Sequence, residues 1–129
     1  MKRLALTTVA LLALAAPALA DPLEGMWRTA RDDNGNSGLI QVAPCGNALC
    51  GTLVRSFDAN GNDLPSAHIG RAIISETVAR GGGEYRGKVY SPDRDKTYSS
   101  RLQLNGDTLA VSGCVLGICR DGGSWTREP

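Results

Sequence analysis

The sequence has few aromatic residues and almost no net charge. It contains one Phe, three Tyr and two Trp in 129 residues, so its core must be built mainly from aliphatic side chains. The formal net charge is +1 at pH 7. A chain without a basic excess lacks the field that draws proteins to nucleic acid or to an anionic membrane. We therefore expect no nucleic-acid partner.

Side chains for catalysis are also scarce. His68 is the one histidine, and no Gly-x-Ser-x-Gly segment is present to supply a nucleophile for it. Two acidic pairs could serve acid–base chemistry, Asp32 with Asp33 and Asp93 with Asp95. Both pairs fall in segments typical of exposed turns, where Asp is common for conformational reasons. We therefore expect no enzymatic activity.

A long apolar run occurs at the start of the chain. Met1-Lys2-Arg3 is basic, residues 4–16 are almost wholly apolar, and Ala18-Leu19-Ala20 matches the small–x–small pattern read by signal peptidase. The run is shorter than the roughly 20 apolar residues of a spanning helix, which disfavours a membrane anchor. The pattern predicts a signal peptide over residues 1–20.

The remaining residues 21–129 are predicted to form a single domain, periplasmic or secreted, with no membrane segment of its own. Removal of Lys2 and Arg3 leaves 12 basic against 13 acidic residues, a net charge of −1. A chain of this length buries only a modest core, so covalent cross-links would help to stabilise it.

Four cysteines supply candidate cross-links. Cys45 and Cys50 have the same spacing as Cys114 and Cys119. This favours two local disulfides, Cys45–Cys50 and Cys114–Cys119, each closing a turn. Bridges that cross between the two pairs remain an alternative. A zinc site is disfavoured by the spacing and by the oxidising setting that the signal peptide implies, so we expect no metal.

The mature chain alternates in polarity, has frequent turn signals and lacks a helical period. Asn105-Gly106, between two extended runs, is the strongest hairpin signal. For residues 71–78 a short helix is the alternative to a strand. The expected fold is all-β, a small antiparallel up-and-down barrel of about eight strands, with a two-sheet sandwich as the alternative. The expected strands are 27–31, 39–43, 51–57, 71–78, 84–90, 97–104, 108–114 and 124–127.

The two ends of the mature chain carry a likeness to lipocalins. Gly25-Met26-Trp27 resembles the Gly-x-Trp motif on the first strand of those barrels. The resemblance implies a structural role for two residues: Trp27 would plug the closed end, and Arg127 from the last strand would pack over it. Trp125 is also expected to be structural, since strand aromatics are more often core residues than ligand-binding ones. A guanidinium over an indole contributes about 0.5–2 kcal/mol.

The chain also resembles domain-of-unknown-function family 2147, a family of small exported bacterial proteins. Its relatives tend to have Asp-Gly where this chain has Arg94-Asp95, which predicts a different turn there. The resemblance implies a lipocalin-like barrel and no established activity. It rests on residues 25–29, 44–46, 49–51, 87–92, 96–98, 113–114 and 125–127.

Two tyrosines, Tyr85 and Tyr98, are the candidate ligand-binding residues, although strand aromatics are more often core residues. Residues 58–63, Asp-Ala-Asn-Gly-Asn-Asp, alternate carboxylates and amides as calcium loops do. Asp63 stands where an EF-hand has Gly, which favours an ordinary polar turn. No cofactor is implied.

The expected function is binding of a small apolar ligand in the barrel mouth. A lumen filled by its own side chains, as in other eight-stranded barrels, would contradict this. The alternative is a cell-envelope interaction protein that acts through its loops, especially residues 58–70, with no internal ligand. An enzyme ranks third.

Overall fold

A computed structural model describes residues 19–129. The predicted signal peptide, up to residue 18, lies outside the described residues. No helix in the described part of the chain is long and apolar enough to cross a membrane.

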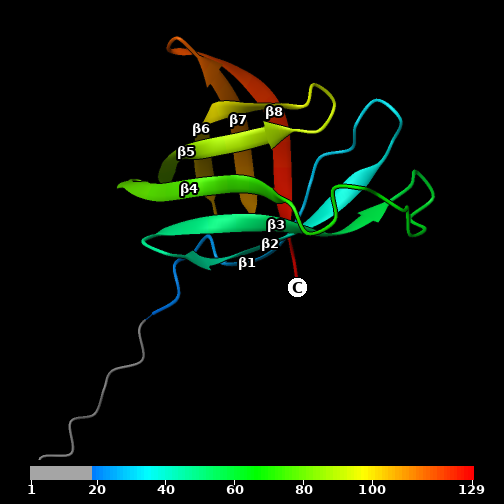
Figure 1. The fold of residues 1–129 in the computed structure, drawn as a ribbon. Coiled ribbons are helices and arrows are strands. Elements are labelled where there is room, and N and C mark those ends of the chain that lie inside the picture. The colour runs from blue at the N-terminus through cyan, green and yellow to red at the C-terminus, as the bar shows by residue number, and fades with distance from the viewer. Residues whose placement is uncertain (1–18) are drawn as a thin grey trace, which may run out of the picture.

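Eight antiparallel strands form one closed barrel in which each strand pairs with its neighbours in sequence (Figure 1). The barrel closes where β1 pairs with β8, with Trp27 opposite Arg127. The predicted up-and-down barrel is therefore confirmed, and residues 72–78 belong to a strand and not to a helix. The strands are β1 (Gly25–Arg28), β2 (Ser37–Cys45), β3 (Ala48–Phe57), β4 (Ala72–Gly81), β5 (Glu84–Ser91), β6 (Lys96–Asn105), β7 (Thr108–Val115) and β8 (Ile118–Glu128).

Several strands extend further than the sequence predicts. Pro44 was expected to stop the second strand but pairs with Leu49 inside the β2–β3 ladder. The last strand was expected to cover only residues 124–127, yet β8 begins at Ile118. In both places a disulfide-linked hairpin carries the pairing up to the turn, where sequence patterns alone suggest a break.

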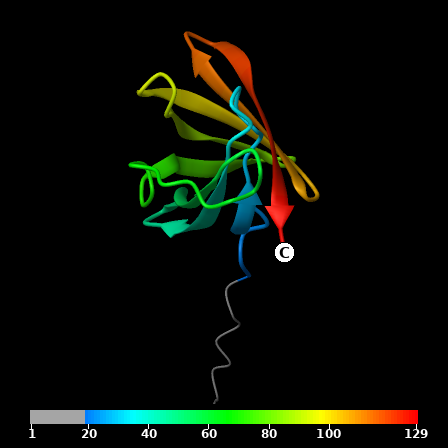
Figure 2. The same ribbon diagram turned by 90° about the vertical axis from the view of Figure 1, so that its right-hand side faces the viewer.

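Because the strands alternate in direction, their connections divide between two ends of the barrel. The end where β1 begins and β8 finishes also carries the two-residue turns 46–47, 82–83 and 106–107. We call this the closed end. The opposite, open end carries the segments 29–36, 58–71, 92–95 and 116–117. Figure 2 looks from the side on which the longer of these loops lie.

The core is built as the composition predicts, from aliphatic side chains with a few aromatics. Trp27, Ile74, Leu102 and Leu109 are fully buried. Gly51 leaves room for two core side chains, since a Cβ there would lie 2.6 Å from Ile74 Cγ1. Leu102 and Leu109 lie in the halves of β6 and β7 nearer the closed end, which leaves the open end to provide a site.

Candidate functional site

The closed end is sealed around Trp27. Its indole Nε1–H donates a hydrogen bond to Leu23 O at 2.9 Å, and both residues are fully buried. The guanidinium carbon of Arg127 lies 4.3 Å from the centre of the Trp27 ring. Arg127 also donates to Glu24 O at 3.0 Å and to Pro22 O at 2.6 Å. The segment before β1 is therefore tied across this end, as the likeness to lipocalins implies.

Tyr85, a candidate ligand residue, belongs to this closed end. It is the second residue of β5, and its hydroxyl donates to Asp21 Oδ1 at 2.6 Å. Burial, together with the hydrogen bond to the Asp21 carboxylate, raises the pKa of Tyr85. Its side chain does not line the cavity at the other end. Its hydroxyl anchors the N-terminal segment.

The open end leads into a cavity of about 1220 Å³, a volume that includes its mouth. Ligand pockets typically measure about 300–1,000 Å³, so the lumen and mouth have room for a small molecule. Tyr98, the other candidate ligand residue, lines this cavity, as does Trp125. The inner wall is largely apolar and includes Ile40, Leu53, Ile73, Val89, Tyr98, Val111 and Trp125.

A cluster around Tyr90 forms part of the mouth. The Arg71 guanidinium lies 3.6 Å from the centre of the Tyr90 ring, and the His68 ring centre lies 5.7 Å from it. The Tyr90 hydroxyl donates to Asp95 Oδ1 at 2.6 Å, and this bond is the main cause of a raised Tyr90 pKa. From the sequence, a lone loop histidine such as His68 is expected to be a surface residue. In the structure His68 is half-buried and lies against the Tyr90 ring.

Arginines of the mouth lack acidic partners. Arg31, Arg94 and Arg120 line the cavity, and within residues 19–129 none has a carboxylate oxygen within 4.0 Å. Two of the aspartates in the same wall are already engaged. Asp32 accepts from the backbone N–H groups of residues 34 and 36, and Asp121 accepts from that of residue 123. Arg31 Nη1 donates to Ala59 O at 3.3 Å, so Arg94 and Arg120 are the cationic groups that this arrangement leaves most available at the entrance.

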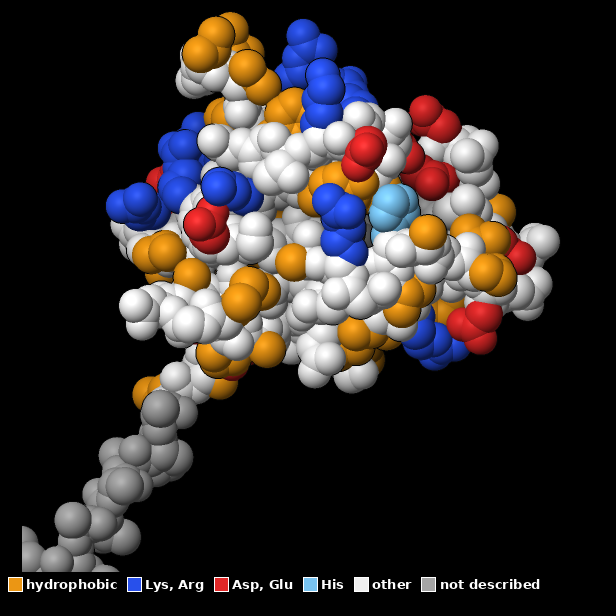
Figure 3. All heavy atoms as spheres, viewed as in Figure 1, with side chains coloured by type: hydrophobic (Ala, Val, Ile, Leu, Met, Phe, Trp, Pro, Cys, Tyr) orange, Lys and Arg blue, Asp and Glu red, His pale blue; other side chains and the backbone are white. Residues whose placement is uncertain are grey.

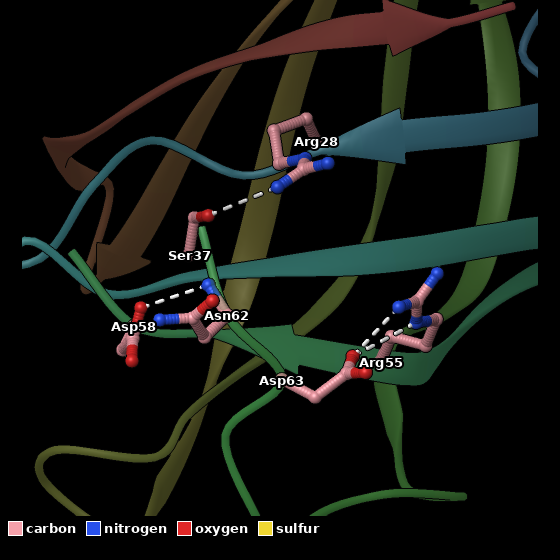
Figure 4. A network of polar contacts seen from close by, with 6 residues as sticks. All are labelled: Arg28, Ser37, Arg55, Asp58, Asn62 and Asp63. Carbon is pink, nitrogen blue, oxygen red and sulfur yellow. Dashed lines mark hydrogen bonds and ion pairs between the residues drawn. The ribbon is translucent and has the colours of Figure 1, made fainter. Parts of the chain in front are cut away.

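The predicted calcium-like loop folds as a polar turn (Figure 4). Asp58 Oδ1 accepts from the backbone N–H of Asn60 and of Asn62, both at 2.9 Å. Asp63 instead pairs with Arg55, with Nη2 at 2.7 Å from Oδ1. Across the described residues, no three His, Cys, Asp or Glu side chains come together as a metal site. The acidic side chains of this loop order its backbone.

Both local disulfides are confirmed, and they lie at opposite ends of the barrel. The Cα atoms of Cys45 and Cys50 are 5.5 Å apart at the closed end. Those of Cys114 and Cys119 are 4.0 Å apart beneath the β7–β8 turn, at the open end. The second bridge therefore holds a hairpin that borders the cavity mouth.

The end of the barrel at which each candidate ligand residue lies was not predicted, although the sequence contains a signal for it. If Trp27 marks the closed end, then counting alternating strand directions places the start of β5 there and the start of β6 at the open end. This count separates Tyr85 from Tyr98. The contact of Arg71 with Tyr90 had no comparable signal, since loop and strand meet only in the folded chain.

A search of curated proteins finds no match to the sequence. Among solved structures, the barrel is similar to one described as "Protein HP1028 from the human pathogen Helicobacter pylori belongs to the lipocalin family". The TM-score is 0.63 with 18% sequence identity, and the similarity covers 83% of each chain. At that identity the likeness shows a lipocalin-like fold.

The model of a family described as "Uncharacterized protein conserved in bacteria (DUF2147)" matches residues 25–127. The chain therefore belongs to this family.

Proposed function

We propose that this protein binds a small ligand with an apolar body and an acidic end, and releases it unchanged. The observation that carries the proposal is the cavity, which opens at one end of a barrel sealed at the other. Because the closed end is occupied by Trp27 and Arg127, the ligand enters and leaves through the mouth.

The apolar body would lie against the inner wall. Ile40, Leu53 and Val111 offer aliphatic surface, while Trp125 and Tyr98 offer flat faces. Burying apolar area contributes roughly 25 cal/mol per Å², so a chain or ring system held here gains most of its affinity from the wall.

The acidic end would remain near the entrance. Arg31, Arg94 and Arg120 offer guanidinium groups without acidic partners in the described chain, and guanidinium forks match carboxylates and phosphates. Of the three aspartates in this wall, Asp32 and Asp121 already accept backbone hydrogen bonds, which leaves Asp93 as the carboxylate that opposes an acidic ligand.

We further propose that binding takes place outside the cytoplasm. Two disulfides in a small domain suit an oxidising compartment, which is consistent with export by the predicted signal peptide.

Titration with cis-parinaric acid, a fluorescent fatty acid, tests the proposal. Energy transfer to the probe should come mainly from Trp125, which lines the cavity, and should fall in Trp125→Phe. Arg120→Gln should weaken binding about tenfold, since a charged hydrogen bond contributes about 1.5–3 kcal/mol. The methyl ester of the probe should bind both proteins alike.

The matched control is Arg86→Gln, which removes an exposed arginine on β5 that does not line the cavity. It should bind the acid as wild type does. Absence of saturable binding to the wild-type protein would contradict the proposed function, and the loop-mediated envelope interaction would become the leading candidate.

A further inference from the structure

The β7–β8 turn, at the mouth, differs from the other tight turns of the barrel. Four hairpins have two-residue turns, and three of these turns consist of Gly46-Asn47, Gly82-Gly83 and Gly106-Asp107. The fourth is Leu116-Gly117, and Leu116 is 97% exposed. A large aliphatic side chain thus stands in water where the other turns have small or polar residues.

The backbone conformation of this turn also disfavours a leucine. Leu116 has φ of 52° and Gly117 has φ of 79°, a combination for which Asn-Gly is the favoured pair. A leucine in the left-handed region is disfavoured locally, because its Cβ crowds the backbone. Leu116 therefore has both a strained backbone and a side chain exposed to water. The packing of the barrel explains neither.

Two further aliphatic residues extend the feature into a surface. Val115 and Ile118 pair across the hairpin and are 54% and 71% exposed. We call Val115, Leu116 and Ile118 the apolar tip. In Figure 3 hydrophobic side chains project where Figure 1 has the β7–β8 turn. The Cys114–Cys119 bridge lies directly beneath the tip and limits its folding back onto the barrel.

The apolar tip is continuous with the cavity. Alternate residues of β7 face the same side, so Val115 continues the row of Leu109 and Val111. Leu109 is fully buried, Val111 is 4% exposed, and Val111 and Val115 both line the cavity. Gly113, which stands between them in this row, also lines the cavity, so the cavity wall runs along β7 from the barrel interior to the tip.

We propose that the apolar tip inserts into a lipid surface, so that the cavity mouth exchanges its ligand directly with the membrane. This extends the proposed function by naming where the ligand comes from. A tip of three side chains is too small for a stable protein interface, which needs about 800 Å² from each partner. Insertion into lipid needs no complementary partner shape.

Local charge fits the same partner. Arg94 and Arg120 line the mouth with the tip and lack acidic partners in the described part of the chain, so they can meet lipid phosphates. Asp93 and Asp121 lie in the same wall, and the mature chain carries a net charge of −1, so long-range attraction is weak. Apolar insertion therefore drives docking, and phosphate contacts add to it.

Flotation of the exported, purified protein with lipid vesicles tests the inference. The wild type should float with phosphatidylcholine vesicles and more strongly when phosphatidylglycerol is added. Leu116→Asn should lower the partition coefficient roughly tenfold or more, because a buried leucine contributes about 1.5–3 kcal/mol. Asn suits the turn, so its melting temperature should be unchanged or higher.

Val78→Ser is the matched control, because Val78 is 45% exposed on β4 and does not line the cavity. It should float as wild type does. The inference is overturned if the wild type stays with the soluble fraction on both vesicles, or if Leu116→Asn floats equally well. Titration of the wild type with cis-parinaric acid without vesicles separates the two ideas: a wild type that floats but binds no probe contradicts only the proposed function, and one that binds the probe but does not float contradicts only the docking.

Discussion

The two disulfide hairpins of this barrel have the same cysteine spacing and opposite surroundings. Cys45–Cys50 closes Gly46-Asn47 at the sealed end, where Trp27 fills the interior. Cys114–Cys119 closes Leu116-Gly117 at the open end, beside the cavity. Under the proposed function, the sealed end provides stability, and the open end meets the ligand and its surroundings. The predictions below test that division.

The largest expected effect on stability comes from replacing Trp27, which plugs the closed end. Trp27→Ala should lower the free energy of unfolding by about 3–5 kcal/mol, because a fully buried indole is lost and a cavity remains. Urea denaturation followed by circular dichroism measures this. Trp125→Phe, at the cavity wall, is the comparison and should cost less, since an aromatic ring is retained. An equal loss in both variants would remove the distinction between the ends.

Replacing Arg127, which packs over Trp27, should have the next largest effect on stability. Arg127→Ala removes the contact with the Trp27 ring and the hydrogen bonds to Glu24 O and Pro22 O. We expect a loss of about 2–3 kcal/mol, given that hydrogen bonds to charged groups contribute about 1.5–3 kcal/mol. Arg127→Lys should recover part of it. Unchanged denaturation midpoints would show that Arg127 does not secure this end.

The two disulfides should contribute similarly to stability and differently to function. On the chain-entropy estimate each short loop contributes about 2 kcal/mol. Replacing both cysteines of either bridge by Ser should therefore lower the free energy of unfolding by about that amount. Only the Cys114/Cys119 pair should also weaken vesicle flotation, because it supports the apolar tip. Equal flotation of the two double variants would contradict this.

The smallest effect is a dependence on alkaline pH. Tyr85 has a raised pKa in the folded protein, so its neutral form is favoured there. Its contribution is complete below the unfolded pKa of about 10 and is lost as pH rises above it, by at most about 1.4 kcal/mol per pH unit. Tyr85→Phe should therefore lose less stability between pH 9 and 11 than wild type.

Tyr90→Phe is the matched variant at the open end. The Tyr90 pKa is also raised, but Arg71 opposes the rise because a nearby cation favours the phenolate. We expect Tyr85→Phe to flatten the alkaline stability profile more than Tyr90→Phe. The opposite order would place the more strongly perturbed tyrosine at the mouth.

Much of the architecture could be predicted from sequence because its signals are local. Hairpin turns such as Asn105-Gly106 and alternating strands such as residues 84–90 depend on neighbours along the chain. The strand ends were harder to predict. Pro44 and Ile118 lie in strands because cross-strand pairing outweighs local preference near the disulfides.

The candidate site was predicted less completely. Tyr98 lines the cavity, whereas Tyr85 holds the N-terminal segment through Asp21. Both residues belong to alternating strands, and only their depth along the barrel axis differs. The apolar tip was not predicted, because a turn expected between Cys114 and Cys119 does not show by its sequence that its aliphatic side chains stand in solvent.

By itself the sequence determined the all-β class of fold with about eight strands and favoured the local disulfides, since these depend on contacts between residues close in the chain. The tertiary structure decided which end of the barrel is open, that a cavity leads from this end towards the interior and that Leu116 stands in solvent. The physical reason is closure: only when β8 pairs with β1 do the side chains of all eight strands acquire an inside, an outside and a depth.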